Sequence, residues 1–128
     1  MSALNVDSAI GAHLAWKRRL EYTILGLANN DLTLQAVCDD TKCLLGIWLY
    51  GEGRTHDDWQ LYAALLERHK RFHQVACQVV TLYHARDQEG ALQVLNGMFE
   101  HLSKEVVDLL TQLREYLRKE SDGRTTVK

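Results

Sequence analysis

The strongest structural signal in the chain lies in residues 62–83, YAALLERHKRFHQVACQVVTLY. Steps of 4 and 3 residues separate the members of one stripe: Tyr62, Leu66, His69, His73, Ala76, Val80 and Tyr83. This heptad pattern predicts a long helix with one side buried in a helical bundle. His69 and His73 therefore occupy core positions, where each ring nitrogen needs a partner. A metal ion shared by the two imidazoles would supply that partner.

Two further long helices are predicted on either side of this stretch. The first begins at Asp7 or Ser8, either of which can cap it, and ends near Ala28. Its apolar side carries Ile10, His13, Trp16, Leu20, Ile24 and Leu27. The last covers about 91–120, with a stripe of Leu92, Leu95, Phe99, Leu102, Val106, Leu109, Leu113 and Tyr116. The central helix is expected to start at 55–58 and to end near Arg86.

The pattern between the first and the central helix is less decisive. Residues 31–41 fit either a short strand or a helical turn. The apolar run 43–50, CLLGIWLY, is too short for periodicity to separate helix from strand. Because the sequence offers no partner strand, we expect a short helix that ends at Gly51-Glu52-Gly53. The predicted fold is all-α, an antiparallel bundle of three long helices plus one short helix. It forms a single domain over 1–128, with a polar, frayed tail at 121–128.

The overall composition is that of a soluble globular protein. Hydrophobic residues make up 46% of the chain and charged residues 25%, and the formal net charge is −2. This charge gives no reason to expect nucleic acid or an anionic membrane as a partner. No apolar run approaches the roughly 20 residues needed to span a bilayer, and the N-terminus lacks the pattern of a signal peptide. We therefore expect a cytoplasmic protein.

The chain contains three cysteines, Cys38, Cys43 and Cys77. An odd number in a chain without a secretion signal argues against a disulfide framework. We expect reduced thiols or metal ligation, with Cys38 and Cys77 as ordinary thiols.

Each candidate metal ligand has an ordinary structural interpretation when it is taken alone. His13 on an apolar helix side is usually a core histidine, and Cys43 beside two leucines is usually a small buried hydrophobe. The evidence for a site is that the four candidates occur together. His13, Cys43, His69 and His73 fall on the inner sides of three predicted elements. One thiolate and three imidazoles form a tetrahedral set that suits one Zn²⁺ per chain. Copper or nickel would accept the same ligands.

The remaining histidines do not fit this set. His56 stands at a predicted helix start beside two aspartates, so it should face solvent. His84 and His101 are neighbours of stripe residues, and we expect them on the flank or the outer side of their helices.

Three motifs contain the four candidate ligands. They are His13-Leu14-Ala15-Trp16, then Cys43-Leu44-Leu45-Gly46-Ile47-Trp48, then His69-Lys70-Arg71-Phe72-His73. In this order they resemble the chemoreceptor zinc-binding domain, whose pattern is His-x-x-aromatic, Cys-x-apolar-Gly-x-Trp and His-x-x-x-His. The resemblance extends over about 7–120 and implies the same four ligands. The motif residues expected to pack around them are Trp16, Gly46, Trp48 and Phe72. Ile47 departs from the pattern, since family members often have lysine there.

The resemblance also implies a bacterial regulatory protein. Family members are usually fused to chemoreceptor signalling regions or to diguanylate cyclase domains, and the family includes sensors of zinc and of hypochlorous acid. Neither kind of neighbouring sequence is present here. We therefore expect a standalone sensor that acts on a separate partner in chemotaxis or cyclic-di-GMP signalling. A homodimer is expected as well, because the long heptad stripes leave an apolar flank to cover.

Cys43 is the expected reactive residue of this set. A metal-bound sulfur stays deprotonated at neutral pH, and a deprotonated sulfur is what oxidants attack. Oxidation would weaken its bond to the metal and loosen residues 43–50. A closed four-ligand site leaves no position for a reactive water, so no enzymatic activity is expected. The alternative function is a structural zinc-stabilised bundle that serves as a protein-interaction module.

Overall fold

The computed structural model describes residues 4–27 and 37–126, with side chains described up to residue 121. Its elements are α1 (Val6–Ile24), α3 (Leu44–Tyr50), the 3-10 helix η1 (Glu52–His56), α4 (Tyr62–His84), α5 (Gln88–Val94), the π-helical segment η2 (Leu95–Phe99) and α6 (Glu100–Thr126). The described residues contain no strand. The predicted all-α helical bundle is confirmed.

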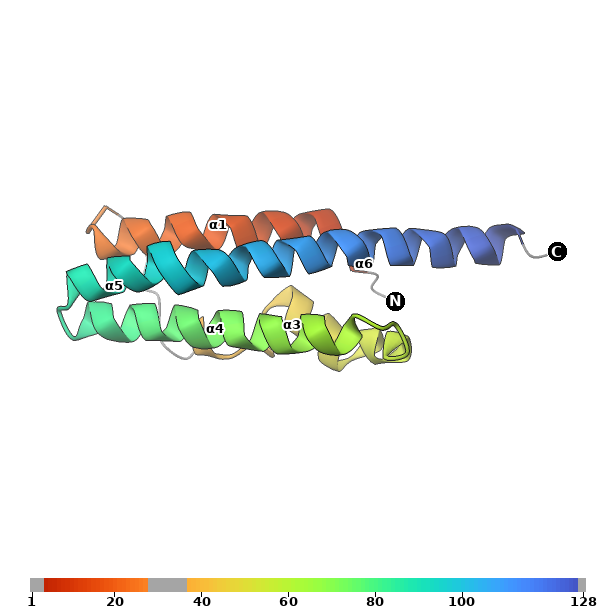
Figure 1. Ribbon diagram of the computed structural model, residues 1–128, viewed down its shortest axis with the longest axis horizontal. Coiled ribbons are helices and arrows are strands. Elements are labelled where there is room, and N and C mark those ends of the chain that lie inside the picture. Colours follow the sequence, from red (N-terminus) through yellow and green to blue (C-terminus); the bar gives the residue numbers. More distant parts are fainter. Residues whose placement is uncertain (1–3, 28–36, 127–128) are drawn as a thin grey trace.

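The long helices lie side by side along one axis (Figure 1). α1 and α4 run in the same direction, while the continuous helix from α5 to α6 runs antiparallel to both. At one end, the Gln88 side chain donates to the carbonyl of Ile24 at 2.8 Å, which ties the start of α5 to the end of α1. Because α1 and α4 are parallel, the chain between them must return along the bundle. α3 and η1 lie on this return path (Figure 1).

Both ends of α1 differ from the prediction. Asn5 caps the helix, since the backbone N–H of Ser8 donates to its side-chain oxygen at 3.0 Å. The other end comes at Ile24 because Gly26 adopts a left-handed backbone with φ of 73°, a conformation that only glycine adopts freely. Leu27, which was predicted to lie on the apolar side, follows this turn and is 70% exposed.

The return path contains the predicted short helix, which is confirmed as α3. Of the ambiguous stretch 31–41, residues 31–36 lie outside the described part of the chain. Val37 and Cys38 are helical, and Val37 is fully buried. The start of α4 at Tyr62 is later than predicted, because 52–61 form η1 and a series of turns.

The prediction for His56 is wrong. Its ring is half-buried and stacks on Trp48, with ring centroids 5.9 Å apart. Its Nδ1 lies 3.1 Å from the hydroxyl of Tyr116 on α6. η1 ends at this histidine and places it between Trp48 and Tyr116, which the neighbouring aspartates did not indicate.

The central part of the α4 stripe is buried as predicted, at His69, His73, Ala76 and Val80. Tyr62, Leu66 and Tyr83, nearer the ends of the stripe, are half-buried. Leu65, Phe72, Val75 and Val79 are buried as well. The buried side of α4 is wider than one stripe because the helix packs against both the last helix and the return path.

The last helix is longer than predicted. Asp87 caps it through the backbone N–H of Gly90 at 2.9 Å, and the helical stretch continues from 88 to 126. Within this stretch, Leu95–Phe99 form one π-helical turn. The predicted stripe is buried at Leu95, Phe99, Leu102, Val106 and Leu113, but Leu110 takes the place of Leu109, which is only half-buried. α6 also extends into the polar tail that was expected to fray.

The expectation that Cys38 and Cys77 are ordinary thiols is wrong. Cys38 and Cys77 form a disulfide across 39 residues, and Cys43 remains free. Spacing gave no sign of this bond, because it joins the return path to α4.

Candidate metal centre

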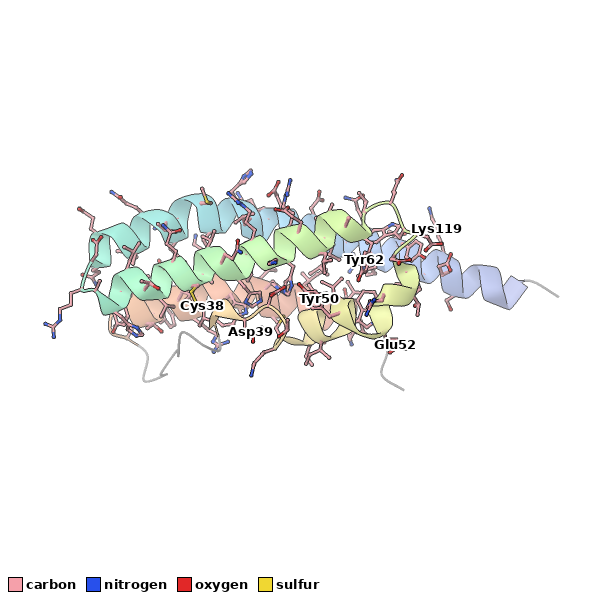
Figure 2. All side chains as sticks on the ribbon, turned by 90° about the horizontal axis from the view of Figure 1, so that it is seen from below. Cys38, Asp39, Tyr50, Glu52, Tyr62 and Lys119 are labelled. Carbon is pink, nitrogen blue, oxygen red and sulfur yellow. A yellow bond between two sulfur atoms is a disulfide. The ribbon has the colours of Figure 1, made fainter. Side chains whose placement is uncertain are left out.

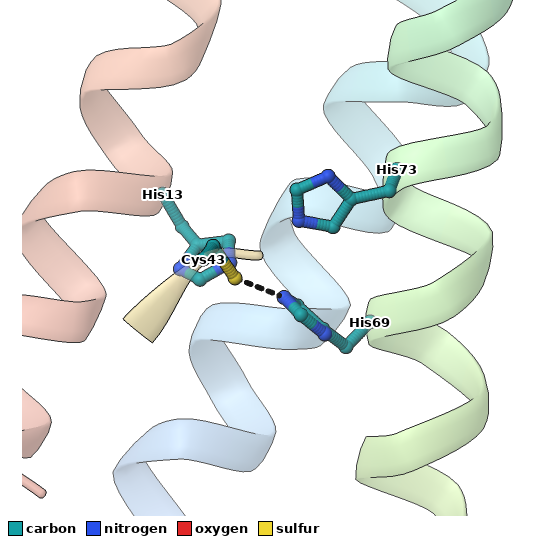
Figure 3. Close-up of side chains that lie close together, drawn as sticks. All are labelled: His13, Cys43, His69 and His73. Carbon is teal, nitrogen blue, oxygen red and sulfur yellow. Dashed lines mark hydrogen bonds between the residues drawn. The ribbon is translucent and has the colours of Figure 1, made fainter. Parts of the chain in front are cut away.

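Four side chains converge in the middle of the bundle (Figure 3). His13 comes from α1, Cys43 from the residue before α3, and His69 and His73 from successive turns of α4. Each residue offers one donor atom, and these atoms all lie within 4.8 Å of one another. Four donors bound tetrahedrally to zinc at about 2.0–2.3 Å would be roughly 3.5 Å apart. The group therefore needs only small movements to close around one ion.

Backbone carbonyls fix the orientation of two of the rings. His13 Nδ1 donates to the carbonyl of Ala9 at 2.8 Å, and His73 Nδ1 donates to the carbonyl of Val37 at 2.9 Å. Since a carbonyl can only accept, Nδ1 carries the proton in each ring and Nε2 keeps its lone pair. Hydrogen bonds of this kind orient histidine ligands in metal sites.

The lone pairs of these rings have no partner within the protein. His13 Nε2 and His73 Nε2 are buried and form no hydrogen bond, and the same holds for His69 Nδ1. A buried polar atom without a partner costs about 1–3 kcal/mol. A metal ion would satisfy Nε2 of His13 and Nε2 of His73, and the ring of His69 would be its third imidazole ligand. The donor set thus fits a metal.

Burial keeps the three imidazoles neutral. It lowers the pKa of His13 to about 4 and that of His69 to about 2, where nearby His13 and His73 add a smaller repulsion. Burial also lowers the pKa of His73. The rings are therefore uncharged at neutral pH, which is the form that binds a metal ion.

Cys43 is the half-buried member of the group. Its sulfur lies 3.1 Å from Nε2 of His69 (Figure 3) and accepts from the backbone N–H of Gly46 at 3.4 Å, which makes it the N-cap of α3. Burial raises the pKa of the thiol. A metal would reverse this effect, since a coordinated thiol loses its proton.

Two of the four expected packing residues lie against the histidines. Phe72 is fully buried, with its ring centroid 5.0 Å from that of His13 and 4.8 Å from that of Phe99 on η2. Trp16 is half-buried, 6.3 Å from His73 between ring centroids. They surround the imidazoles with apolar surface.

The other two packing residues belong to α3. Gly46 faces the backbone of Asp40, where an added Cβ would lie 1.6 Å from the carbonyl oxygen. Trp48 is buried and packs its indole against Gly53 and His56, towards the end of the bundle. Gly46 therefore sets how closely α3 approaches the residues before Cys43.

The sequence could not show the two carbonyls that orient His13 and His73. Backbone acceptors have no residue-type signature, and Val37 lies 36 residues before His73 in the chain. Only the folded return path brings it to α4.

The fold and the site together define a helical bundle with an internal centre for one metal ion. A family model described as the chemoreceptor zinc-binding domain matches residues 13–80, a segment that contains His13, Cys43, His69 and His73. The chain belongs to the chemoreceptor zinc-binding domain family. Zinc is accordingly its metal cofactor, and the family is a regulatory one and not a family of enzymes.

Searches of curated proteins and of solved structures found no match. Within the described residues, none of the helices combines the length and the apolar character that a membrane crossing requires.

Proposed function

We propose that His13, Cys43, His69 and His73 bind one Zn²⁺ per chain, and that this centre makes the domain a sensor of oxidants or of zinc itself. The observation that carries the proposal is the set of unpartnered, buried imidazole nitrogens gathered beside a single sulfur. Neutral rings and one ionisable thiol are the donors that zinc accepts. The four-donor set also leaves no obvious position for a reactive water, in keeping with a regulatory role.

Cys43 is the proposed point of reaction with an oxidant. Bound zinc would keep its sulfur deprotonated at neutral pH. With hypochlorous acid, the net reaction gives the sulfur an OH group, and chlorine leaves as chloride with the bonding electron pair. The sulfur is oxidised by two electrons to sulfenic acid, the first and reversible oxidation product. The donor set then loses its only anion.

Loss of this sulfur would also affect α3. Cys43 caps the helix, and α3 has only seven residues, too few to be stable without its cap and its packing. Leu45 and Leu49 still hold α3 to the core. We propose that oxidation loosens residues 43–50 against the bundle and that this change is the signal.

The zinc-loaded protein should release zinc when it is titrated with hypochlorous acid, in proportion to sulfenic acid formed at Cys43. Amide exchange of 43–50 should become faster over the same titration. Met98 is a matched control, because it is 51% exposed and also oxidisable. Met98→Leu should release zinc as the wild type does.

Two outcomes of this titration would count against sensing. If zinc stays bound after Cys43 is oxidised, the sulfur is not the releasing ligand. If zinc is released while amide exchange of 43–50 stays unchanged, the site reacts with the oxidant without producing a conformational change. The structural zinc bundle would then be the better description.

We further propose that the domain forms a homodimer through the groove between α1 and α3. This groove has a volume of about 460 Å³ and is lined mainly by apolar residues, among them Leu4, Leu44 and Ile47. Leu44 is 75% exposed and Ile47 is 57% exposed, so a second copy would cover them.

Light scattering should give twice the chain mass of 14.7 kDa, and Leu44→Glu should shift the protein towards monomer. A monomeric wild type at micromolar concentration would contradict the proposal.

The signal is proposed to reach a separate protein of the chemoreceptor or diguanylate cyclase type, in chemotaxis or cyclic-di-GMP signalling. The family description supports this direction by its link to chemoreceptors. The alternative, a zinc-stabilised interaction module, shares the same site and the same groove. The titration described above separates the two.

A further inference from the structure

The Cys38–Cys77 disulfide takes no part in the function proposed so far. Cys77 lies one turn beyond His73 on α4, and Cys38 directly follows Val37. Figure 2 shows Cys38 and Asp39 on the stretch that runs alongside α4. Both cysteines are half-buried. A thiol or phosphine from solvent can therefore approach the bond.

The residues around Cys38 hold the metal centre from two directions. On one side, the carbonyl of Val37 accepts the hydrogen bond from His73 Nδ1 at 2.9 Å. On the other side, the backbone of Asp40 packs against Gly46, and its carbonyl lies 4.0 Å from the sulfur of Cys43. The 37–43 segment thus supplies both a positioning contact and a candidate ligand.

Non-covalent contacts tie this segment more firmly to α3 than to α4. The hydroxyl of Tyr50 on α3 donates to the carboxylate of Asp40 at 2.6 Å. Towards α4, the side-chain hydrogen bond from His73 to Val37 is joined by the burial of the Val37 side chain. The disulfide is the covalent link between the segment and α4. If the disulfide opened, only the weaker non-covalent contacts would maintain the distance between Cys43 and the pair His69 and His73.

We propose that Cys38 and Cys77 form a reversible dithiol–disulfide site that controls how firmly the 37–43 segment is held against α4, and thereby the affinity of the centre for zinc. This inference rests on the proposed zinc function. The bond closes a loop of 39 residues, so its removal gives the unfolded and locally opened chain more freedom. The oxidised form should therefore bind zinc more tightly than the reduced form.

The chemistry is ordinary thiol–disulfide exchange. In the oxidising direction, the thiolate of one cysteine attacks a low-molecular-weight disulfide, and one thiolate leaves. The second protein thiolate then attacks the mixed disulfide, closes the Cys38–Cys77 bond and expels the other thiolate. In total the two protein thiols lose two electrons and two protons, and the small disulfide is reduced to two thiols. A dithiol reductant reverses the exchange.

The test compares zinc affinity of the full chain in three forms: oxidised, reduced with a phosphine, and with both Cys38→Ser and Cys77→Ser. Phosphine reduction consumes one water and yields phosphine oxide and two thiols. The double variant keeps all four candidate ligands. We expect the reduced form and the double variant to bind zinc about 10–100-fold more weakly than the oxidised form, the range typical when a partner of a metal ligand is disturbed. Oxidised glutathione should restore the affinity of the reduced wild type but not that of the variant.

Free-thiol counts and amide exchange make the result decisive. Reduction should raise the number of titratable thiols in the metal-free chain from one to three, since Cys43 is already free. Exchange of 37–50 should become faster at the same time. Equal zinc affinities in all three forms, or a thiol count that stays at one, would overturn the inference. If no form binds zinc, the proposed zinc function fails. Amide exchange of 37–50 then tests whether the disulfide holds the 37–43 segment against α4. Faster exchange after reduction supports this role, and unchanged exchange contradicts it.

Discussion

Cys43→Ser should lower the zinc affinity of this domain by more than about a hundredfold, and His69→Ala should do so as well. Structural zinc sites contribute about 10–16 kcal/mol of apparent binding free energy. Loss of one of four donors removes roughly a quarter of it, about 3 kcal/mol, which corresponds to about a hundredfold in affinity. Metal analysis should show one zinc per wild-type chain and a competition assay should show the loss.

The serine variant isolates the role of the sulfur. Serine is a good helix cap, so α3 keeps its start while the soft donor is replaced by a hard one. His101→Ala is the matched control, because His101 points away from the core with 74% of its side chain exposed. It should bind zinc as the wild type does. If Cys43→Ser retains full affinity, Cys43 is not a ligand.

Zinc removal should also destabilise the fold. Without the ion, Nε2 of His13 and Nε2 of His73 remain buried without a partner, at about 1–3 kcal/mol each. A chelator should therefore lower the melting temperature of the wild type. The same chelator should have little effect on Cys43→Ser, which has already lost most of its zinc.

Gly46→Ala should be strongly destabilising, although it adds only one methyl group. The new Cβ would lie 1.6 Å from the carbonyl oxygen of Asp40, a backbone atom that cannot rotate away. α3 must then move away from Asp40, and Cys43, which caps α3, moves with it. Overpacking typically costs about 1–3 kcal/mol, and contact with backbone places this case at about 3 kcal/mol or above. Urea unfolding measures the stability and metal analysis the zinc content.

Gly11→Ala is the control for this substitution. Gly11 lies within α1, and a Cβ there would meet no atom within 4 Å. Alanine should stabilise the helix by about 0.5–1 kcal/mol, because glycine loses more backbone freedom when it folds. Wild-type stability and zinc content in Gly46→Ala would show that α3 does not depend on this close approach.

Local sequence patterns determined the helical class of this protein and the identity of the residues that meet at its centre. A helix fixes which residues share a side, so the 4- and 3-residue steps around His69 and His73 were enough to place both in the core. The same reasoning located His13 on the inner side of α1, while Cys43 was placed by the apolar run 43–50 that it begins. Helix ends were less predictable, because a single residue such as Asn5 can cap a helix in place of the nearby candidates Asp7 and Ser8.

Tertiary structure alone decided how the centre is held. The parallel course of α1 and α4 sends the chain back along the bundle, which places the carbonyl of Val37 at His73 and Cys38 beside Cys77. It also brings His56 onto Trp48, against the expectation from its neighbours. The first two contacts join residues 36 and 39 positions apart, and the first uses a backbone carbonyl, a group that every residue possesses. Periodicity reports which side of a helix is buried, whereas such contacts depend on which segment covers it.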